Sequence, residues 1–199
     1  MVNFWNAVKT RRTYYGINKD FVASDKRIAD VVKDAVLYTP SSFNSQSARV
    51  VLLLGKAHDA LWDLTKEALR KVVPPDNFAA TENKIRSFGD GYGTVLFFED
   101  QNVVAGLQAQ FPLYKDNFPI WSQHSSGMLQ LVVWMALEQE GFGASLQHYA
   151  PLIDEGIREK WHTPAEWKLI AQMPFGKPTS APGAKEFQSI EERFKVYRS

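Results

Sequence analysis

Cysteine is absent from this chain of 199 residues. Without a thiol, the chain has no disulfide, no thiolate nucleophile, no iron–sulfur cluster and no cysteine-based zinc site. Its four histidines are scattered, with no His-x-x-x-His pair and no carboxylate at metal-ligand spacing, so we expect no metal site. Any redox chemistry would therefore rest on a bound organic cofactor.

An excess of charge of one sign and long apolar runs are also missing. The 23 basic residues nearly match the 22 acidic ones, so no long-range field favours nucleic acid or an anionic membrane. No apolar run approaches the about 18 residues of a membrane span, and the start of the chain lacks the pattern of a secretory signal. We predict a cytoplasmic protein that acts on small molecules and binds neither nucleic acid nor membrane.

Two common catalytic patterns are not present either. No Gly-x-Ser-x-Gly motif occurs, which argues against a serine hydrolase of the nucleophile-elbow type. Gly89, Gly91 and Gly93 stand before an apolar run, whereas a dinucleotide-binding fingerprint has its glycines after a strand and at the start of a helix. We therefore expect no Rossmann-type cofactor site.

What the sequence does contain is a mixture of helical and strand patterns, with 45% hydrophobic residues. This content is sufficient for a single domain over residues 1–199. Ser24 is placed to cap a helix that begins at Asp25 and ends before Pro40. Further helices are expected over 60–72, 77–88 and 151–161, and strands over 50–54 (buried on both faces), 94–98 and 169–173, the last ended by Pro174.

Two segments look incomplete within one chain. Apolar residues cover almost every face of the helix expected over 122–140, which predicts a helix that is fully buried or shared with a partner chain. Residues 179–199 contain few core residues before Phe194, Val196 and Tyr197, so they resemble an arm that packs on something else. Both features predict a subunit interface.

Two polar segments are candidates for a binding site. Residues 40–46 carry two hydroxyls, Ser41 and Ser42, and two amides, Asn44 and Gln46, which could surround a planar polar heterocycle such as a flavin. The alternative is a solvated turn, because such side chains often bond their own backbone. Residues 11–13, Arg-Arg-Thr, could bind a phosphate, although a pair of arginines can equally form a solvated face.

Together, Arg11-Arg12-Thr13 and the segment Pro40-Ser41-Ser42-Phe43-Asn44-Ser45-Gln46 about thirty residues later resemble the FMN-dependent nitroreductase family. The segments 91–100 and 143–149 resemble a small subfamily that includes a fungal fatty-acid-response protein and a bacterial copper-induced nitroreductase. The resemblance spans nearly the whole chain. It implies an α+β fold, with a central, mainly antiparallel sheet surrounded by helices, in an intertwined homodimer with FMN in the interface.

The resemblance also implies roles for particular residues. Cofactor contacts are expected from residues near the start, in the middle and near the end of the chain: Arg11, Arg12, Thr13, Tyr15, Ser41, Ser42, Asn44, Gln46, Lys84, Gln147, His148, Arg193 and Lys195. The arginines and Thr13 would bind the phosphate and ribityl chain, Ser41 and Ser42 the ribityl or phosphate end, and Asn44 and Gln46 the polar edge of the ring.

The remaining assignments carry alternatives. Lys84 would stabilise the reduced ring, or is an exposed lysine on a solvated helix face. Gln147 and His148 would make mostly main-chain contacts. Tyr15 stands where many members carry a basic residue, and Lys185 is a weaker candidate than Arg193 and Lys195 for a C-terminal cation.

The activity implied is that of an NAD(P)H-dependent flavin nitroreductase. NADH or NADPH would reduce FMN and leave, and a nitroarene or quinone would then take the electrons in the same pocket, with no side chain acting as nucleophile. The alternative is a flavin-binding redox sensor with little turnover. The sequence identifies neither the physiological acceptor nor the preferred nucleotide.

Overall fold

The computed structural model describes residues 4–198; the ends of the predicted domain, residues 1–3 and 199, lie outside the described residues. The strands form an antiparallel sheet in the order β1-β5-β3-β2, and β4 also pairs with β5. Their bounds are β1 Ile17–Asn18, β2 Ala48–Leu54, β3 Gly93–Asp100, β4 Gly143–Ala144 and β5 Trp167–Pro178. The predicted α+β class and its mainly antiparallel sheet are confirmed.

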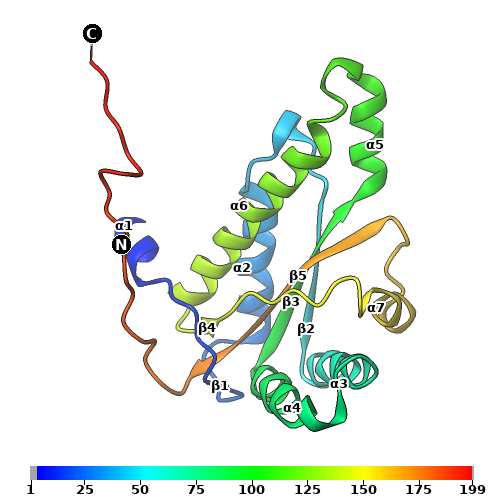
Figure 1. The fold of residues 1–199 in the computed structure, drawn as a ribbon, viewed down its shortest axis with the longest axis vertical. Helices are drawn as coiled ribbons and strands as arrows, with labels where there is room; N and C mark the ends of the chain where they lie inside the picture. The colour runs from blue at the N-terminus through cyan, green and yellow to red at the C-terminus, as the bar shows by residue number, and fades with distance from the viewer. Residues whose placement is uncertain (1–3, 199) are drawn as a thin grey trace.

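Helices lie on both faces of this sheet (Figure 1). Their bounds are α1 Phe4–Thr10, α2 Asp25–Tyr38, α3 Lys56–Arg70, α4 Pro75–Gly89, α5 Gln101–Gln110, α6 Phe118–Gln139 and α7 Asp154–Trp161, with short 3-10 turns η1 Ser42–Asn44 and η2 Pro112–Tyr114. The Ser24 side chain accepts the Arg27 N–H and caps α2, as predicted. Helix α5, which begins where the Asp100 side chain accepts the Asn102 N–H, was not predicted.

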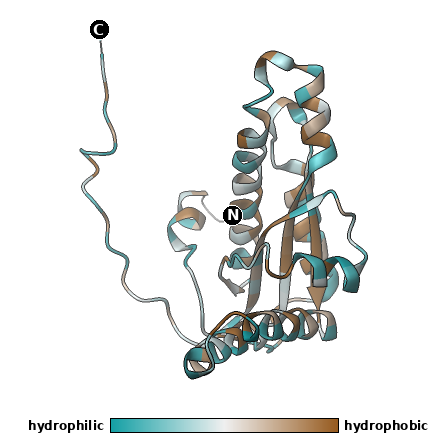
Figure 2. Cartoon of the chain, turned by 45° about the vertical axis from the view of Figure 1, so that its right-hand side comes forward, coloured by the Kyte–Doolittle hydropathy of each residue, from teal (hydrophilic) through white to brown (hydrophobic). Residues whose placement is uncertain are grey.

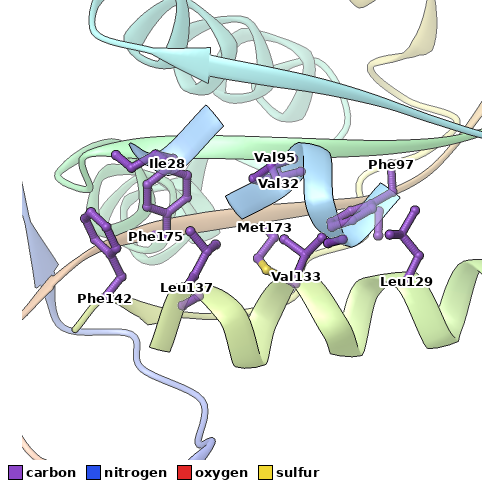
Figure 3. Packing of buried hydrophobic residues seen from close by; sticks show 13 residues of the cluster. Ile28, Val32, Val95, Phe97, Leu129, Val133, Leu137, Phe142, Met173 and Phe175 are labelled. Atoms are coloured by element: carbon purple, nitrogen blue, oxygen red, sulfur yellow. The ribbon is translucent and has the colours of Figure 1, made fainter. Parts of the chain in front are cut away.

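One hydrophobic cluster fills the space between the sheet and the helices α2 and α6 (Figure 3). Val95 and Phe97 on β3 pack here against Ile28 of α2 and Leu137 of α6, together with Phe175 of β5. Each side chain of this size that is fully buried contributes roughly 1.5–3 kcal/mol to the free energy of folding. This cluster fixes α2 and α6, and therefore the turn that follows α2.

A second cluster lies on the other face, under α3, α4 and α7. It contains a polar network in which His58 Nε2 donates to the Gly89 carbonyl (3.1 Å) and, in the neutral imidazole, Nδ1 accepts from Thr94 Oγ1 (2.9 Å). The Trp62 indole N–H donates to the same hydroxyl at 3.0 Å. A neutral His58 allows all three of these bonds, and burial favours this form because it lowers the pKa of the imidazole.

Strand β3 is buried along its whole length, whereas β2 is not. A Cβ at Gly93 would lie 2.6 Å from side-chain atoms of both Leu54 and Phe175, so any other residue would require these side chains to move. The prediction that 50–54 is buried on both faces is wrong, because β2 ends the sheet and only Leu53 is fully buried. The outer edge of β2 borders an open groove.

The prediction that Pro174 ends the last strand is also wrong. Strand β5 continues to Pro178, since Pro174 pairs with Thr94 of β3 and its carbonyl accepts the Ser145 N–H at 3.2 Å. Beyond it, Phe175 and Gly176 pair with β4. The strand continues past Pro174 because β3 pairs with it on one side and β4 on the other.

Helix α6 and the C-terminal segment leave apolar side chains uncovered. On α6, Met128, Leu131 and Val132 are exposed, although the opposite side of the helix is buried. The segment that follows Pro178 first lies beside residues 11–16, where the Arg12 guanidinium donates to the Gly183 carbonyl, and then leaves the rest of the chain (Figure 2), with Phe187, Phe194 and Tyr197 exposed. No helix of the described residues is long and apolar enough to cross a membrane.

Acid is expected to destabilise the fold through His58. Its pKa in the folded protein lies below the ordinary value of 6.5, so the unfolded chain binds the proton first as the pH falls, and stability drops below that pH. Urea unfolding at pH 7 and pH 5 measures the effect. Replacing exposed His124 with Gln should leave the difference unchanged, whereas His58→Gln should reduce it; an equal difference in both variants would contradict the assignment.

Candidate functional site

The segment that follows α2 is a strained turn that is bonded to its own backbone, and Phe43, Asn44 and Gln46 in it are exposed. Phe43, Asn44 and Gln46 have positive φ angles of 57°, 50° and 48°. Such angles are uncommon for residues other than glycine and cost of order 1–3 kcal/mol each. The turn is closed by the Gln46 N–H on Ser41 Oγ (2.9 Å) and is tied to α6 by the Ser42 N–H on Ser125 Oγ (3.3 Å).

The strained turn presents two amides to the outside. Asn44 and Gln46 are both exposed, and the described residues give the Asn44 side chain no hydrogen-bond partner. Ser41 and Gln46 line one end of a cavity of about 720 Å³ between α2 and β2, whose other lining residues are mostly apolar. The arrangement therefore offers polar groups at one end of an apolar groove.

Arg49 of β2 forms a hydrogen bond to the backbone of this turn. Its guanidinium donates to the Gln46 carbonyl at 2.8 Å and to Asp100 Oδ2, also at 2.8 Å. Because Asp100 is nearly buried at the end of β3, the ion pair fixes the guanidinium against the sheet. Arg49 also lies 5.9 Å from the ring centre of Trp167.

A second acid, Glu99, lies beside this support. Its side chain is fully buried, and Oε2 accepts a hydrogen bond from Ser47 Oγ at 2.6 Å. Burial raises the pKa of Glu99 to about 7, against the opposing effects of Ser47 and Arg49. The other oxygen, Oε1, has no hydrogen-bond partner among the described residues.

Aromatic rings surround the outer side of the turn. The Phe43 ring stacks on Trp121 with centroids 5.8 Å apart and planes at 17°. The ring centroids of Phe111 and Phe118 lie 5.1 and 5.2 Å from the centroid of Phe43. The turn therefore adjoins an aromatic cluster built from η1, α6 and the connection between α5 and α6.

The predicted phosphate-binding residues form a separate cavity of about 470 Å³. It is lined by Arg11, Arg12, Thr13 and Tyr15 on one side and by residues 180–185, which include Lys185, on the other. Glu138 of α6 accepts the backbone N–H of Arg12 at 2.8 Å, and the Arg11 guanidinium lies over the ring of Trp134 at 4.4 Å. Three residues with cationic side chains, Arg11, Arg12 and Lys185, thus line one cavity.

The other predicted residues are dispersed. Lys84 is exposed on α4, and His148 is exposed after β4. Gln147 is buried, and its backbone N–H and C=O both bond Gln172, at 2.7 and 2.9 Å. Arg193 and Lys195 are exposed in the C-terminal segment, and neither lines the cavity that contains Lys185.

Within one chain the two halves of the predicted site stay apart. Arg11, Arg12 and Thr13 line one cavity, whereas Ser41 and Gln46 line the other. Sequence reasoning missed the supporting residues Arg49, Glu99 and Asp100. The two acids could have been noticed as charged residues that end an apolar strand, but nothing local marks Arg49. Among the described residues, no group of three or more histidines or acids could hold a metal ion.

Comparison with known proteins identifies the family. The family model "Nitroreductase family" matches residues 8–177. The nitroreductase FRM2 of Saccharomyces cerevisiae is 33% identical over 190 residues, with 93% of each chain covered, and HBN1 of the same yeast is 32% identical over 189 residues, with 94% of each covered.

A solved structure agrees along nearly the whole chain. The nitroreductase CinD from Lactococcus lactis, in complex with chloramphenicol, is 40% identical and superposes with a TM-score of 0.91 over 98% of this chain and 100% of that one. Sequence, family model and fold point to one conclusion. The chain belongs to the nitroreductase family of oxidoreductases.

Proposed function

We propose that the protein is an FMN-dependent oxidoreductase that takes electrons from NADH or NADPH and reduces nitroaromatic compounds or quinones. In this proposal, residues 1–199 form one FMN-binding domain that functions as a homodimer. One observation carries the proposal. This member of the nitroreductase family has both a cavity lined by Arg11, Arg12 and Lys185 and a strained turn on which Asn44 and Gln46 are exposed.

The residues present fit the two ends of FMN. Its phosphate needs cations and donors, which Arg11, Arg12 and Thr13 supply around one cavity. Its ring has donors and acceptors along one edge, which side-chain amides match because each amide both donates and accepts. Asn44 and Gln46 are exposed on the turn that would present them.

The separation of these groups within one chain supports a site formed by two copies. One copy would bind the phosphate with Arg11 and Arg12, while the turn of the other contacts the ring. Each copy also has apolar surface to cover: Leu37 and Tyr38 at the end of α2 are 69% and 77% exposed. Burial of such side chains drives stable association.

The C-terminal segment is the part of the second copy that we expect in the groove beside β2. The groove is mostly apolar, and it borders the free edge of the sheet. After β5 the segment is irregular, with a turn at 190–193, and it carries exposed Phe187, Ile190 and Phe194. Exposed apolar side chains complement an apolar groove, and the unpaired strand edge beside it offers backbone donors and acceptors.

Bound FMN would supply the hydride and electron transfer of the reaction. The protein would bind and orient it: Arg11 and Arg12 hold the phosphate, and Asn44 and Gln46 fix the edge of the ring. We propose that the Lys84 ammonium stabilises negative charge on the reduced ring and that the backbone at His148 approaches its other edge.

The aromatic rings beside the turn favour flat molecules as electron acceptors. Phe43, which is 51% exposed at the edge of the aromatic cluster, offers a ring with which a planar acceptor can make contact. CinD has been solved with chloramphenicol and with 4-nitrophenol, both nitrophenyl compounds. We therefore propose nitroarenes as one acceptor class and quinones as another.

The purified protein is expected to be yellow and to hold about one FMN per chain. Replacing Asn44 and Gln46 together with Ala should weaken FMN binding by about tenfold or more, since each lost hydrogen bond contributes roughly 1 kcal/mol. Fluorescence titration of the apo protein measures this. The paired control Asn77→Ala with Asn102→Ala, at two exposed amides elsewhere, should bind as the wild type does. A colourless protein that binds no added FMN would refute the function.

Mixing two defective chains should restore one site per dimer. A chain with Arg11→Ala and Arg12→Ala lacks the phosphate half, and a chain with Asn44→Ala and Gln46→Ala lacks the ring half. If each site draws its halves from different copies, the co-expressed heterodimer has one intact and one doubly defective site. It should bind FMN at half the wild-type stoichiometry, while both parent homodimers bind weakly. Equally weak binding by the heterodimer would place both halves in one chain.

Turnover separates an enzyme from a sensor. An enzyme should oxidise NADH or NADPH continuously when 4-nitrophenol or a quinone is present, whereas a sensor should be reduced once and stall. Stopped-flow reduction by each nucleotide, followed by steady-state oxidation, measures both properties. Single reduction without turnover on either acceptor class would contradict the catalytic proposal.

A further inference from the structure

Glu99 is an acid in a position where an apolar residue would stabilise the fold. It lies two residues after Phe97 on β3, so both side chains face the layer of α2 and α6. The side chain is 0% exposed, and Oε1 has no partner among the described residues. A buried carboxyl with an unsatisfied oxygen destabilises a folded protein, so its presence requires another explanation.

The contact that Glu99 makes leads to the strained turn. Ser47, the donor to Oε2, directly follows Gln46. The Ser47 carbonyl accepts the Asp100 N–H at 2.9 Å, and Ser47 Oγ lies 3.5 Å from Ser45 Oγ. The end of β3 therefore holds Ser47 by its side chain through Glu99 and by its backbone through Asp100.

A second set of contacts restrains Gln46, the residue before Ser47. Asp100 binds Arg49, and Arg49 binds the Gln46 carbonyl. Two consecutive acids of β3 thus restrain Gln46, Ser47 and Arg49, the stretch in which the turn enters β2. Arg49 and Asp100 are the charged groups that act on Glu99; Lys168 lies opposite it on β5.

The turn requires such restraint because its backbone is unfavourable. Three positive φ angles outside glycine persist only where the surroundings impose them. If the grip on Ser47 were released, Gln46 could relax to an ordinary φ, and its amide would turn away from the position it now occupies. The buried Glu99 destabilises the core, but it helps to hold the side-chain amides of Asn44 and Gln46 in fixed positions.

We propose that Glu99 is a positioning residue: through Ser47 it holds the turn 43–46 in the strained conformation that presents Asn44 and Gln46 to the flavin ring. This inference rests on the proposed function, since the ligand it serves is FMN. Glu99 does not contact the ring itself. It acts through one hydroxyl and the backbone of the next residue.

If Glu99 positions the turn, replacing it should change the affinity for FMN without lowering the stability of the apo protein. Glu99→Leu removes the acceptor and fills the same space, so the apo protein should unfold at the wild-type temperature or higher. Its dissociation constant for FMN should nevertheless rise by about tenfold. Glu99→Gln keeps an acceptor for Ser47 and should stay within about threefold of wild type.

Riboflavin identifies which half of the site is affected. The turn serves the ring, so Glu99→Leu should weaken riboflavin and FMN binding by the same factor, whereas Arg11→Ala should weaken FMN binding selectively. Asp154→Leu is the matched control, because Asp154 is also an acid with a buried, unpartnered oxygen and a pKa raised by burial. It adjoins Ile153 and Ile157 on the opposite face of the sheet and should leave FMN affinity unchanged.

Fluorescence titration with both flavins and thermal unfolding of the apo proteins decide the matter. A folded Glu99→Leu variant that binds FMN as tightly as wild type would overturn the proposal, as would a loss of affinity matched by an equal loss in Asp154→Leu. If Glu99→Leu fails to fold, Ser47→Ala breaks the same contact and must show the same loss for both flavins. A wild-type protein that binds no flavin would refute the proposed function instead.

Discussion

The cross-strand contact between the end of β3 and the start of β2 is the constraint on which the candidate site depends. Two antiparallel strands place Glu99 and Asp100 opposite Ala48 and the residues around it. From there the acids reach Ser47 and Arg49, which in turn hold Gln46. Because β3 is buried between two helical layers, it provides a rigid base for a turn whose own backbone is unfavourable.

This base explains why hydroxyl and amide side chains in residues 40–46 do more than close a turn. The Ser41 hydroxyl accepts the Gln46 N–H and the backbone N–H of Ser42 donates to Ser125, while the side chains of Asn44 and Gln46 are exposed. The cations for a phosphate collect elsewhere, around a cavity that includes residues 180–185. A ligand with a polar ring at one end and a phosphate at the other would join the two halves through a second copy of the chain.

Local patterns predicted most of the fold, and they marked residues 11–13 and 40–46 as the segments of the candidate site. The Ser24 cap, the apolar runs of β2 and β3 and the helical spacing of α3 and α6 are all read from neighbours in sequence. What failed depended on contacts between distant segments: β2 is half open because it ends the sheet, and β5 passes Pro174 because β3 and β4 hold it. Arg49 and Glu99 were missed for the same reason, since their partners lie about fifty residues away.

The central claim is that one flavin is bound by groups from two copies of this chain. A crystal structure of the protein grown with FMN tests it most directly. The account predicts the phosphate against Arg11 and Arg12 of one copy and the ring edge against Asn44 and Gln46 of the other, with Glu99 still bonded to Ser47. A flavin whose phosphate and ring contact the same chain, or one bound away from both segments, would contradict it.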